Sequence, residues 1–309
     1  MKVHNSLESV TKITNAVVTT GTFDGAHLGH QKILKKLNQL ADECQGESVL
    51  FTFFPHPRMV LFPNDHGLKL LNTLEEKKER LAASGLDHLI VHPFSRDFSR
   101  LSALQYVRDI MVNVLNVHTM VVGYDHHFGR NREGNIETLR EFSQTYDFKV
   151  DEISALDIEE VNVSSTKIRK AISQGQIHLA NDYLGYEYSF RGIVVKGEQR
   201  GRLLGFNTAN IEVNDDLKIM PAQGVYAVQC MVNEELHLGM LNIGVNPTFN
   251  SNNETHVEVH LFDFDREIYG ERMTVFLIKK LRDERKFSSQ EELVQQLNAD
   301  KRLSIETLR

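Results

Sequence analysis

Two histidines, His27 and His30, lie three residues apart in the segment 21–30, "GTFDGAHLGH", between a strand-like run and a helix-like run. At such a junction both imidazoles would lie beside the N-terminus of a helix, where unpaired N–H groups and the helix dipole attract anions. Gly21 and Gly25 would let the backbone turn tightly and approach a ligand closely. This combination suits a phosphate group whose negative charge increases in a transition state.

An H-x-x-H pair is by itself also compatible with a surface pair or with two ligands of a metal ion. The segment contains no H-E-x-x-H, and no nearby carboxylate has the usual spacing of a third ligand. It is neither a Walker loop nor a G-x-G-x-x-G fingerprint. The spacing alone therefore leaves phosphate chemistry and a structural role open.

The composition limits the kinds of partner and compartment. The chain has 309 residues, enough for about two domains, and a formal net charge of −7, which disfavours a nucleic-acid partner. Cys44 and Cys230 offer neither a disulfide framework nor a thiolate zinc site. The N-terminus lacks a signal-peptide core, and no apolar run approaches the roughly 18 residues of a membrane span. We expect a cytoplasmic protein with small-molecule substrates and no membrane partner; its oligomeric state stays open.

The first part of the chain alternates strand-like and helix-like patterns. Strands are expected at 16–20, 48–54, 88–94 and 119–124, and helices at 30–44, 73–85 and 102–115. Such alternation predicts an α/β domain with a Rossmann-like parallel sheet and right-handed crossovers. Ligands bind such sheets at the carboxyl ends of the strands, which is where the two histidines would lie.

Beyond residue 185 the pattern becomes all-β. Strand-like segments separated by turn signals occupy 188–196, 208–213, 224–232, 237–245, 256–264 and 272–281. So many short strands predict a compact antiparallel Greek-key barrel, and a helical run at 288–303 could cover one of its ends. We therefore expect two domains, residues 1–185 and residues 186–309.

The segments 21–30 and 164–169, "SSTKIR", together resemble the H-x-G-H and S-S-T-x-x-R motifs of bacterial FAD synthetases in the nucleotidyltransferase superfamily. On its own, "SSTKIR" also predicts a helix N-cap, and the two interpretations are compatible. The resemblance implies that FMN and ATP give FAD and pyrophosphate, with His27 and His30 stabilising the transition state. It further implies ATP and phosphate contacts from Gly21, Phe23, Asp24, Gly25, Ser164, Ser165, Thr166 and Arg169.

Two other segments match the same family in order and spacing, "FTFFPHPR" at 51–58 and "VGYDHHFGRNREGN" at 122–135. The resemblance implies that they line the flavin and ATP sites. The flavin contacts implied for the whole chain are Phe54, Pro55, His56, Asp125 and Asn210.

The segment 197–210, "GEQRGRLLGFNTAN", resembles the riboflavin kinase signature G-x-x-x-G-R-x-L-G-F-P-T-A-N, although by composition it is a glycine-rich hairpin turn. The resemblance implies Mg²⁺ ligation by Thr208 and Asn210, and proton removal from the riboflavin 5′-hydroxyl by Glu258. Without it, Glu258 would be an outward residue of an alternating strand. The implied phosphate contacts are Gly197, Gly201, Arg202 and Gly205.

One position departs from the kinase signature, because Asn207 stands where the family has proline. The expected function is bifunctional: riboflavin is phosphorylated to FMN, and FMN is adenylylated to FAD. ATP, riboflavin and FMN would be substrates, and Mg²⁺ the cofactor. The alternative is a monofunctional FMN adenylyltransferase whose barrel only binds flavin.

Overall fold

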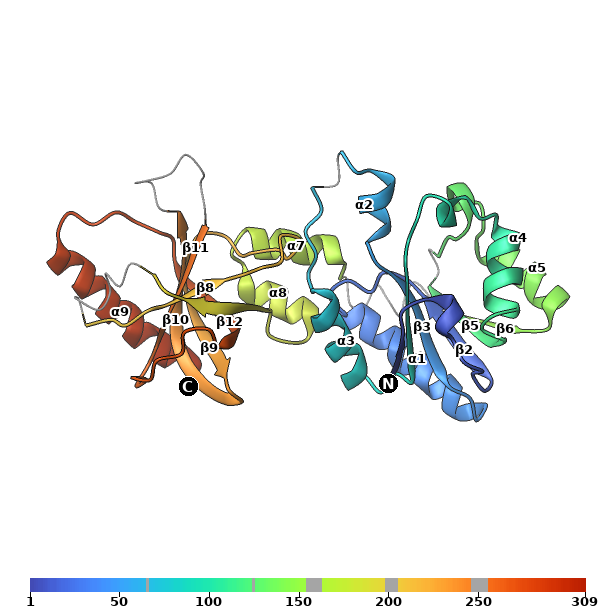
Figure 1. Ribbon diagram of the computed structural model, residues 1–309, viewed down its shortest axis with the longest axis horizontal. Coiled ribbons are helices and arrows are strands. Elements are labelled where there is room, and N and C mark those ends of the chain that lie inside the picture. Colours follow the sequence, from blue (N-terminus) through green and yellow to red (C-terminus); the bar gives the residue numbers. More distant parts are fainter. Residues whose placement is uncertain (65–66, 124–125, 154–162, 198–204, 246–254) are drawn as a thin grey trace. The chain divides into compact units, whose positions relative to one another are not determined.

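The chain, described by a computed structural model, folds into two compact units, Met1–Ser165 and Thr166–Arg309 (Figure 1). The residues that the structure describes are 1–64, 67–123, 126–153, 163–197, 205–245 and 255–309. The expected fold class is confirmed, with a parallel α/β sheet in the first unit and a closed antiparallel barrel in the second. Along the sequence, the helices α7 (Ser165–Ser173) and α8 (Ile177–Leu184) come after the strands of the sheet and before those of the barrel. The expected domain boundary at residue 185 stays a prediction.

The first unit is built on a six-stranded parallel sheet with the order β1-β4-β3-β2-β5-β6. Its strands are β1 (Lys2–His4), β2 (Ala16–Thr20), β3 (Ser48–Phe53), β4 (His88–His92), β5 (Val117–Gly123) and β6 (Lys149–Ile153). From β2 the chain adds β3 and β4 on one side and later β5 and β6 on the other. The strand order therefore reverses at β2, and ligands bind at such a switch point, outside the carboxyl ends of the strands.

Helices cover both faces of this sheet (Figure 1). Val17 and Leu50 pack with residues of α1 and α3, whereas their chain neighbours Val18 and Phe51 pack with residues of η3 and α5, because successive side chains of a strand point to opposite faces. The helices are α1 (Leu28–Glu43), α2 (Pro57–Leu61), α3 (Leu74–Ala83), α4 (Ala103–Gln105), the π-helix η3 (Tyr106–Val112) and α5 (Ile136–Tyr146). Short 3₁₀ turns are η1 (Leu7–Ser9), η2 (Phe98–Arg100) and η4 (Arg130–Arg132).

The second unit is a closed barrel with the strand order β10-β11-β8-β7-β12-β9. Its strands are β7 (Ser189–Val195), β8 (Ala209–Glu212), β9 (Gly224–Val232), β10 (Glu235–Val245), β11 (Thr255–Leu261) and β12 (Arg272–Arg282). Asn181 on α8 donates to the carbonyl of Leu277 (2.9 Å) and accepts from the backbone N–H of Tyr188 (2.8 Å), which fixes α8 to the barrel. No helix of the described residues is long and apolar enough to cross a bilayer.

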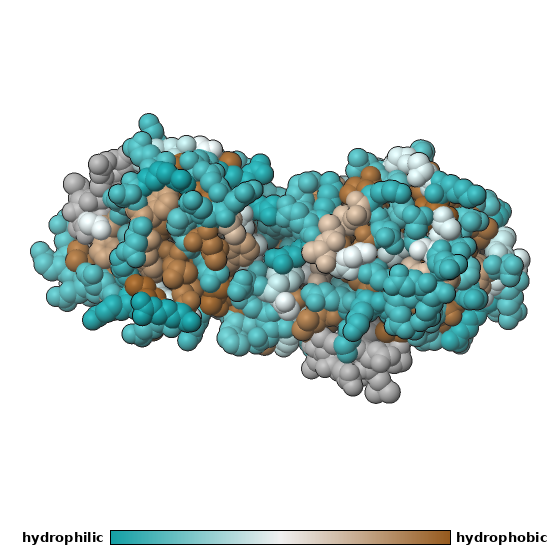
Figure 2. All heavy atoms as spheres, turned by 90° about the horizontal axis from the view of Figure 1, so that it is seen from below, coloured by the Kyte–Doolittle hydropathy of each residue, from teal (hydrophilic) through white to brown (hydrophobic). Residues whose placement is uncertain are grey.

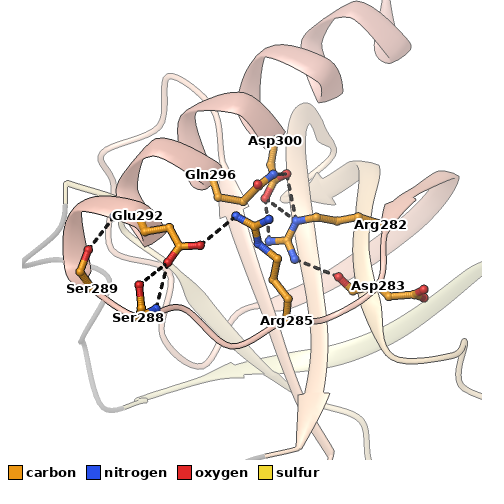
Figure 3. Close-up of polar contacts among 8 residues, drawn as sticks. All are labelled: Arg282, Asp283, Arg285, Ser288, Ser289, Glu292, Gln296 and Asp300. Carbon is orange, nitrogen blue, oxygen red and sulfur yellow. Dashed lines mark hydrogen bonds and ion pairs between the residues drawn. The ribbon is translucent and has the colours of Figure 1, made fainter.

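The C-terminal helix α9 (Gln290–Leu308) is fastened to the barrel by a buried ion pair (Figure 3). The guanidinium of Arg282, at the end of β12, donates to both carboxylate oxygens of Asp300, with the shortest distance 2.8 Å. Gln296 donates to the same carboxylate at 2.7 Å. Asp300 is only 2% exposed, so these donors replace the water that its charge loses.

Asp300→Asn should loosen α9, because it leaves the guanidinium of Arg282 without its buried counter-charge. We expect the free energy of opening, measured by hydrogen exchange at α9 amides, to fall by about 3 kcal/mol. Asp283→Ala is the matched control, because its exposed carboxylate pairs only at the surface with Lys280. It should change the exchange little, and an equal effect of both substitutions would contradict a special role for the buried pair.

Candidate active sites

The segment that follows β2 places both histidines at the start of α1. His27 is the N-cap of the helix, and its Nδ1 accepts a hydrogen bond from the backbone N–H of His30 (3.4 Å). The helix begins at Leu28, so His27 directly precedes its first residue and His30 lies in its first turn. Gly25 has a φ of 86°, the left-handed region that favours glycine.

The two imidazoles form a stack with one aromatic ring. The ring centroids of His27 and His30 are 3.7 Å apart with an interplanar angle of 16°, and Phe23 lies on His30 at 4.5 Å. A Cβ at Gly29 would lie 3.3 Å from the His27 ring. Glycine between the two histidines therefore leaves room for the stack.

The surroundings of His30 disfavour the charged form of its ring. Desolvation lowers the pKa of His30 well below its usual value, and the nearby charges of His27 and Lys77 lower it further. Its Nδ1 is buried and makes no hydrogen bond to any residue that the structure describes. A polar atom in this state gains free energy when a ligand supplies the missing partner.

Lys77 is a site residue that sequence reasoning missed. It lies on α3, is 6% exposed, and its ammonium donates to the carbonyl of Thr22 at 2.8 Å. Burial lowers the pKa of Lys77, while the charge of Asp24 opposes that effect. No spacing connects residue 77 to the histidines, so only the packing of α3 could reveal it.

The two motifs of the first unit meet in space. Ser165 donates through Oγ to the backbone carbonyl of Asp24 at 2.9 Å, although the residues are 141 positions apart. The Asp24 carboxylate is 1% exposed and accepts from the backbone N–H groups of Leu71 (3.0 Å) and Asn72 (3.4 Å). In the described residues it anchors a neighbouring segment, and its expected phosphate contact stays a prediction.

The other expected site residues of the first half are placed as follows. Thr166 and Arg169 lie on α7 three positions apart, which is the spacing of one helix face. Phe54 follows β3 and is 37% exposed, and Pro55 comes next. His56 is the N-cap of α2 and accepts from the backbone N–H of Arg58. Asp125 lies outside the described residues, as do Gly201 and Arg202 of the kinase half.

The barrel has two cavities that share a residue. One has a volume of about 250 Å³; its surface is mostly apolar, with side chains such as Phe206 and Met240, and it also carries charged residues, which are Glu258, Arg282, Glu284 and Arg285. The other measures about 270 Å³ and is lined by residues that include Tyr269. Thr208 lines both cavities. We call the cavity of about 250 Å³ the apolar cavity and that of about 270 Å³ the hairpin cavity. On the face drawn in Figure 2, hydrophobic side chains gather in the middle of this unit (left), with hydrophilic ones around them.

Oxygen ligands gather beside Thr208. Asn210 is paired directly with Glu258 across β8 and β11, so their side chains lie on the same face of the barrel wall. A Cβ at Gly197 would meet the side-chain amide of Asn210, so a larger residue there would displace that amide. Gly205, at the other end of this segment, has a φ of 79°.

A hydroxyl, an amide and a carboxylate are the hard oxygen donors that Mg²⁺ prefers, and Mg²⁺ commonly completes its shell with substrate phosphates. The donor set therefore fits the expected ion. Within the described part of the chain, no group of three or more His, Cys, Asp or Glu side chains is suited to a metal. A protein-only cage is thus not seen there.

Both halves match known families. Residues 10–167 match the family model of FAD synthetase, and residues 184–308 match that of riboflavin kinase. A bifunctional riboflavin kinase/FMN adenylyltransferase of Listeria monocytogenes is 40% identical over 93% of this chain and 90% of its own length. One of Bacillus subtilis is 37% identical over 94% and 92%.

A solved structure gives the same architecture for the whole length. The crystal structure titled "Macrolide-efflux Protein from Streptococcus pneumoniae" is 32% identical, covers 98% of both chains, and has a TM-score of 0.89. That title describes that protein, whereas the two family models and the curated relatives agree on flavin chemistry. On the two family models and these relatives, the chain belongs to the family of bifunctional riboflavin kinase/FMN adenylyltransferases.

Proposed function

We propose that this chain makes FAD from riboflavin in two steps, each in its own half. The barrel transfers a phosphoryl group from ATP to riboflavin, and the α/β unit joins the resulting FMN to AMP from a second ATP, which releases pyrophosphate. The observation that carries this proposal is that the FAD synthetase model covers residues 10–167 and the riboflavin kinase model covers residues 184–308. The nucleotide and flavin substrates and the free cysteines support a reducing, cytoplasmic setting.

In adenylyl transfer, a phosphate oxygen of FMN attacks the α-phosphorus of ATP, so the protein has to position two anions and stabilise the charge that develops between them. The stacked pair His27 and His30 supplies imidazoles at the N-terminus of α1, a favourable place for anions. The buried, unpartnered Nδ1 of His30 supports this role. Ser164, Ser165, Thr166 and Arg169 would hold the nucleotide, with Gly21, Phe23 and Gly25 facing its phosphates.

In the kinase half, riboflavin would enter the apolar cavity and ATP the hairpin cavity. A flat ring system suits a pocket lined by apolar side chains with a few polar groups. Glu258 lines the apolar cavity, where its carboxylate would take the proton of the 5′-hydroxyl. Thr208, which lines both cavities, lies where the phosphoryl group would pass. Thr208 and Asn210 would hold Mg²⁺, which neutralises polyphosphate charge when bound.

The relatives favour two activities over a barrel that only binds flavin, because they are named as bifunctional over nearly the whole length. Two observations favour the same choice: Thr208 and Glu258 line one cavity, and Asn210 is paired with Glu258 across β8 and β11.

His30→Gln should lower FAD formation from FMN by roughly 10²–10³-fold, because it removes a group aimed at developing phosphate charge. Phosphorylation of riboflavin by the same protein should stay near the wild-type rate. Both rates can be read by chromatography of the flavins. His118→Gln is the control, because His118 lies near the start of β5, away from the carboxyl ends of the strands where the site is expected. This variant should keep both activities. Normal FAD synthesis by the His30 variant would exclude His30 from the chemistry.

The ligand-free first unit should lose stability in acid through His30. Its folded pKa lies below the unfolded value of about 6.5, so the unfolded state binds more protons and stability falls as the pH drops below that value. His30→Gln should reduce this fall by up to about 1.4 kcal/mol per pH unit. Hydrogen exchange at β2 and β5 amides between pH 7.5 and 5.5 measures it. If stability falls with pH by the same amount in the wild type and in His30→Gln, the uncharged state of His30 is contradicted.

Glu258→Gln should abolish phosphorylation of riboflavin, because the amide cannot accept the hydroxyl proton. FAD formation from added FMN should remain. Glu212→Gln is the matched control, since Glu212 is an exposed residue of the adjacent strand β8. A Glu258 variant with a normal kinase rate would show that another group, or water, takes the proton.

A further inference from the structure

A single imidazole holds the chain beside Thr208. Nδ1 of His260 lies 2.7 Å from the backbone carbonyl oxygen of Asn207. A carbonyl only accepts hydrogen bonds, so the proton of the ring must be on Nδ1. His260 therefore donates to the residue that directly precedes Thr208.

This bond lies where strand pairing stops. The register between β8 and β11 pairs Asn210 with Glu258 and Ala209 with Val259. The next position in the same register would set Thr208 opposite His260, but β8 begins only at Ala209. The His260 side chain thus continues the attachment of this segment after the backbone ladder has ended.

Aromatic packing fixes the ring that makes the bond. The His260 ring contacts Phe206 edge to face at a centroid distance of 5.1 Å and Phe262 at 5.7 Å. Both phenylalanines are buried, and His260 is itself nearly buried. Phe206 and Asn207 are consecutive and directly precede Thr208. His260 contacts both of them: its ring packs against Phe206, and its Nδ1 donates a hydrogen bond to Asn207.

We propose that His260 is a positioning residue of the kinase half, which holds the Asn207 carbonyl and thereby fixes Thr208 between the two cavities. The inference rests on the proposed role of Thr208. It also explains how the backbone before Thr208 is held although residue 207 is asparagine. The riboflavin kinase signature has proline at this position. A proline ring restricts its own φ and the conformation of the preceding residue. Asparagine lacks that restriction, and the bond from His260 supplies an alternative one.

Two substitutions of His260 separate the hydrogen bond from packing. In His260→Asn, the side-chain amide nitrogen can replace Nδ1 as donor, whereas His260→Leu keeps apolar volume and has no donor. Riboflavin kinase activity of the full chain, measured as kcat and KM for ATP–Mg²⁺ and for riboflavin, should fall about two- to tenfold in kcat/KM for His260→Leu. It should fall less for His260→Asn. FAD formation from FMN by the same proteins reports correct folding of the rest of the chain.

The decisive step is to repeat both measurements with Asn207→Pro. If the hydrogen bond and the proline act on the same segment, Asn207→Pro should raise kcat/KM more in the His260→Leu protein than in the wild type. Equal factors in the two backgrounds, or equal losses for His260→Asn and His260→Leu, would overturn the inference. Thr208→Val tests the proposed role of Thr208 separately: unchanged kinase activity in that variant would refute that role, whereas a wild-type chain that phosphorylates no riboflavin would refute the proposed function, whatever the result at His260.

Discussion

The ring of His30 stacks between Phe23 and His27, its buried Nδ1 makes no hydrogen bond to the described residues, and desolvation lowers its pKa well below the usual value. A buried polar atom without a partner destabilises a fold by about 1–3 kcal/mol. The first unit tolerates it because the surrounding segment is held from several sides. Lys77 ties down the carbonyl of Thr22, and backbone N–H groups hold the carboxylate of Asp24. The site is thus rigid before a ligand arrives, as electrostatic stabilisation of a phosphate requires.

The barrel also has to hold a site residue in place, and it does so with different contacts. Its cavities need a wall residue, Thr208, that is fixed although it lies outside the regular strand β8. Glu258 and His260 on β11 both line the apolar cavity; Glu258 is the proposed proton acceptor, and His260 donates to the backbone carbonyl of Asn207. On the other side of the same cavity, the ion pair of Arg282 and Asp300 fastens α9, which contributes Leu297 to the lining (Figure 3). Each half therefore positions its reacting groups through buried polar contacts.

Periodicity predicted the architecture well where the strands are buried. The central strands β2 to β5, the six barrel strands and the helix α9 agree with the patterns of the sequence. The strands β1 and β6 were not predicted, since "KVH" is too short for a pattern and "KVDEI" is a polar edge strand. The helix expected at 102–115 contains a π-helical part, η3, which periodicity does not distinguish.

The site was predicted only as far as its motifs extend. The meeting of Ser165 with Asp24 agrees with motifs that share one site. The residues that hold the motif residues, such as Lys77 and His260, were not predicted, because their partners are remote in the sequence and only the fold brings them together. The carboxylate of Asp24 accepts from backbone N–H groups, a contact that the motif did not indicate, and its expected phosphate contact stays a prediction.

The central claim is that the imidazole of His30 is neutral in the ligand-free protein and contacts a phosphate group when one binds. Nitrogen-15 NMR of histidine-labelled protein at pH 7 reports the protonation and tautomer of each imidazole directly. The account predicts a neutral His30 ring in the ligand-free protein and a change of its ring nitrogen shifts when pyrophosphate is added, with His118 unaffected. A charged His30 before addition, or shifts that do not respond to pyrophosphate, would contradict it.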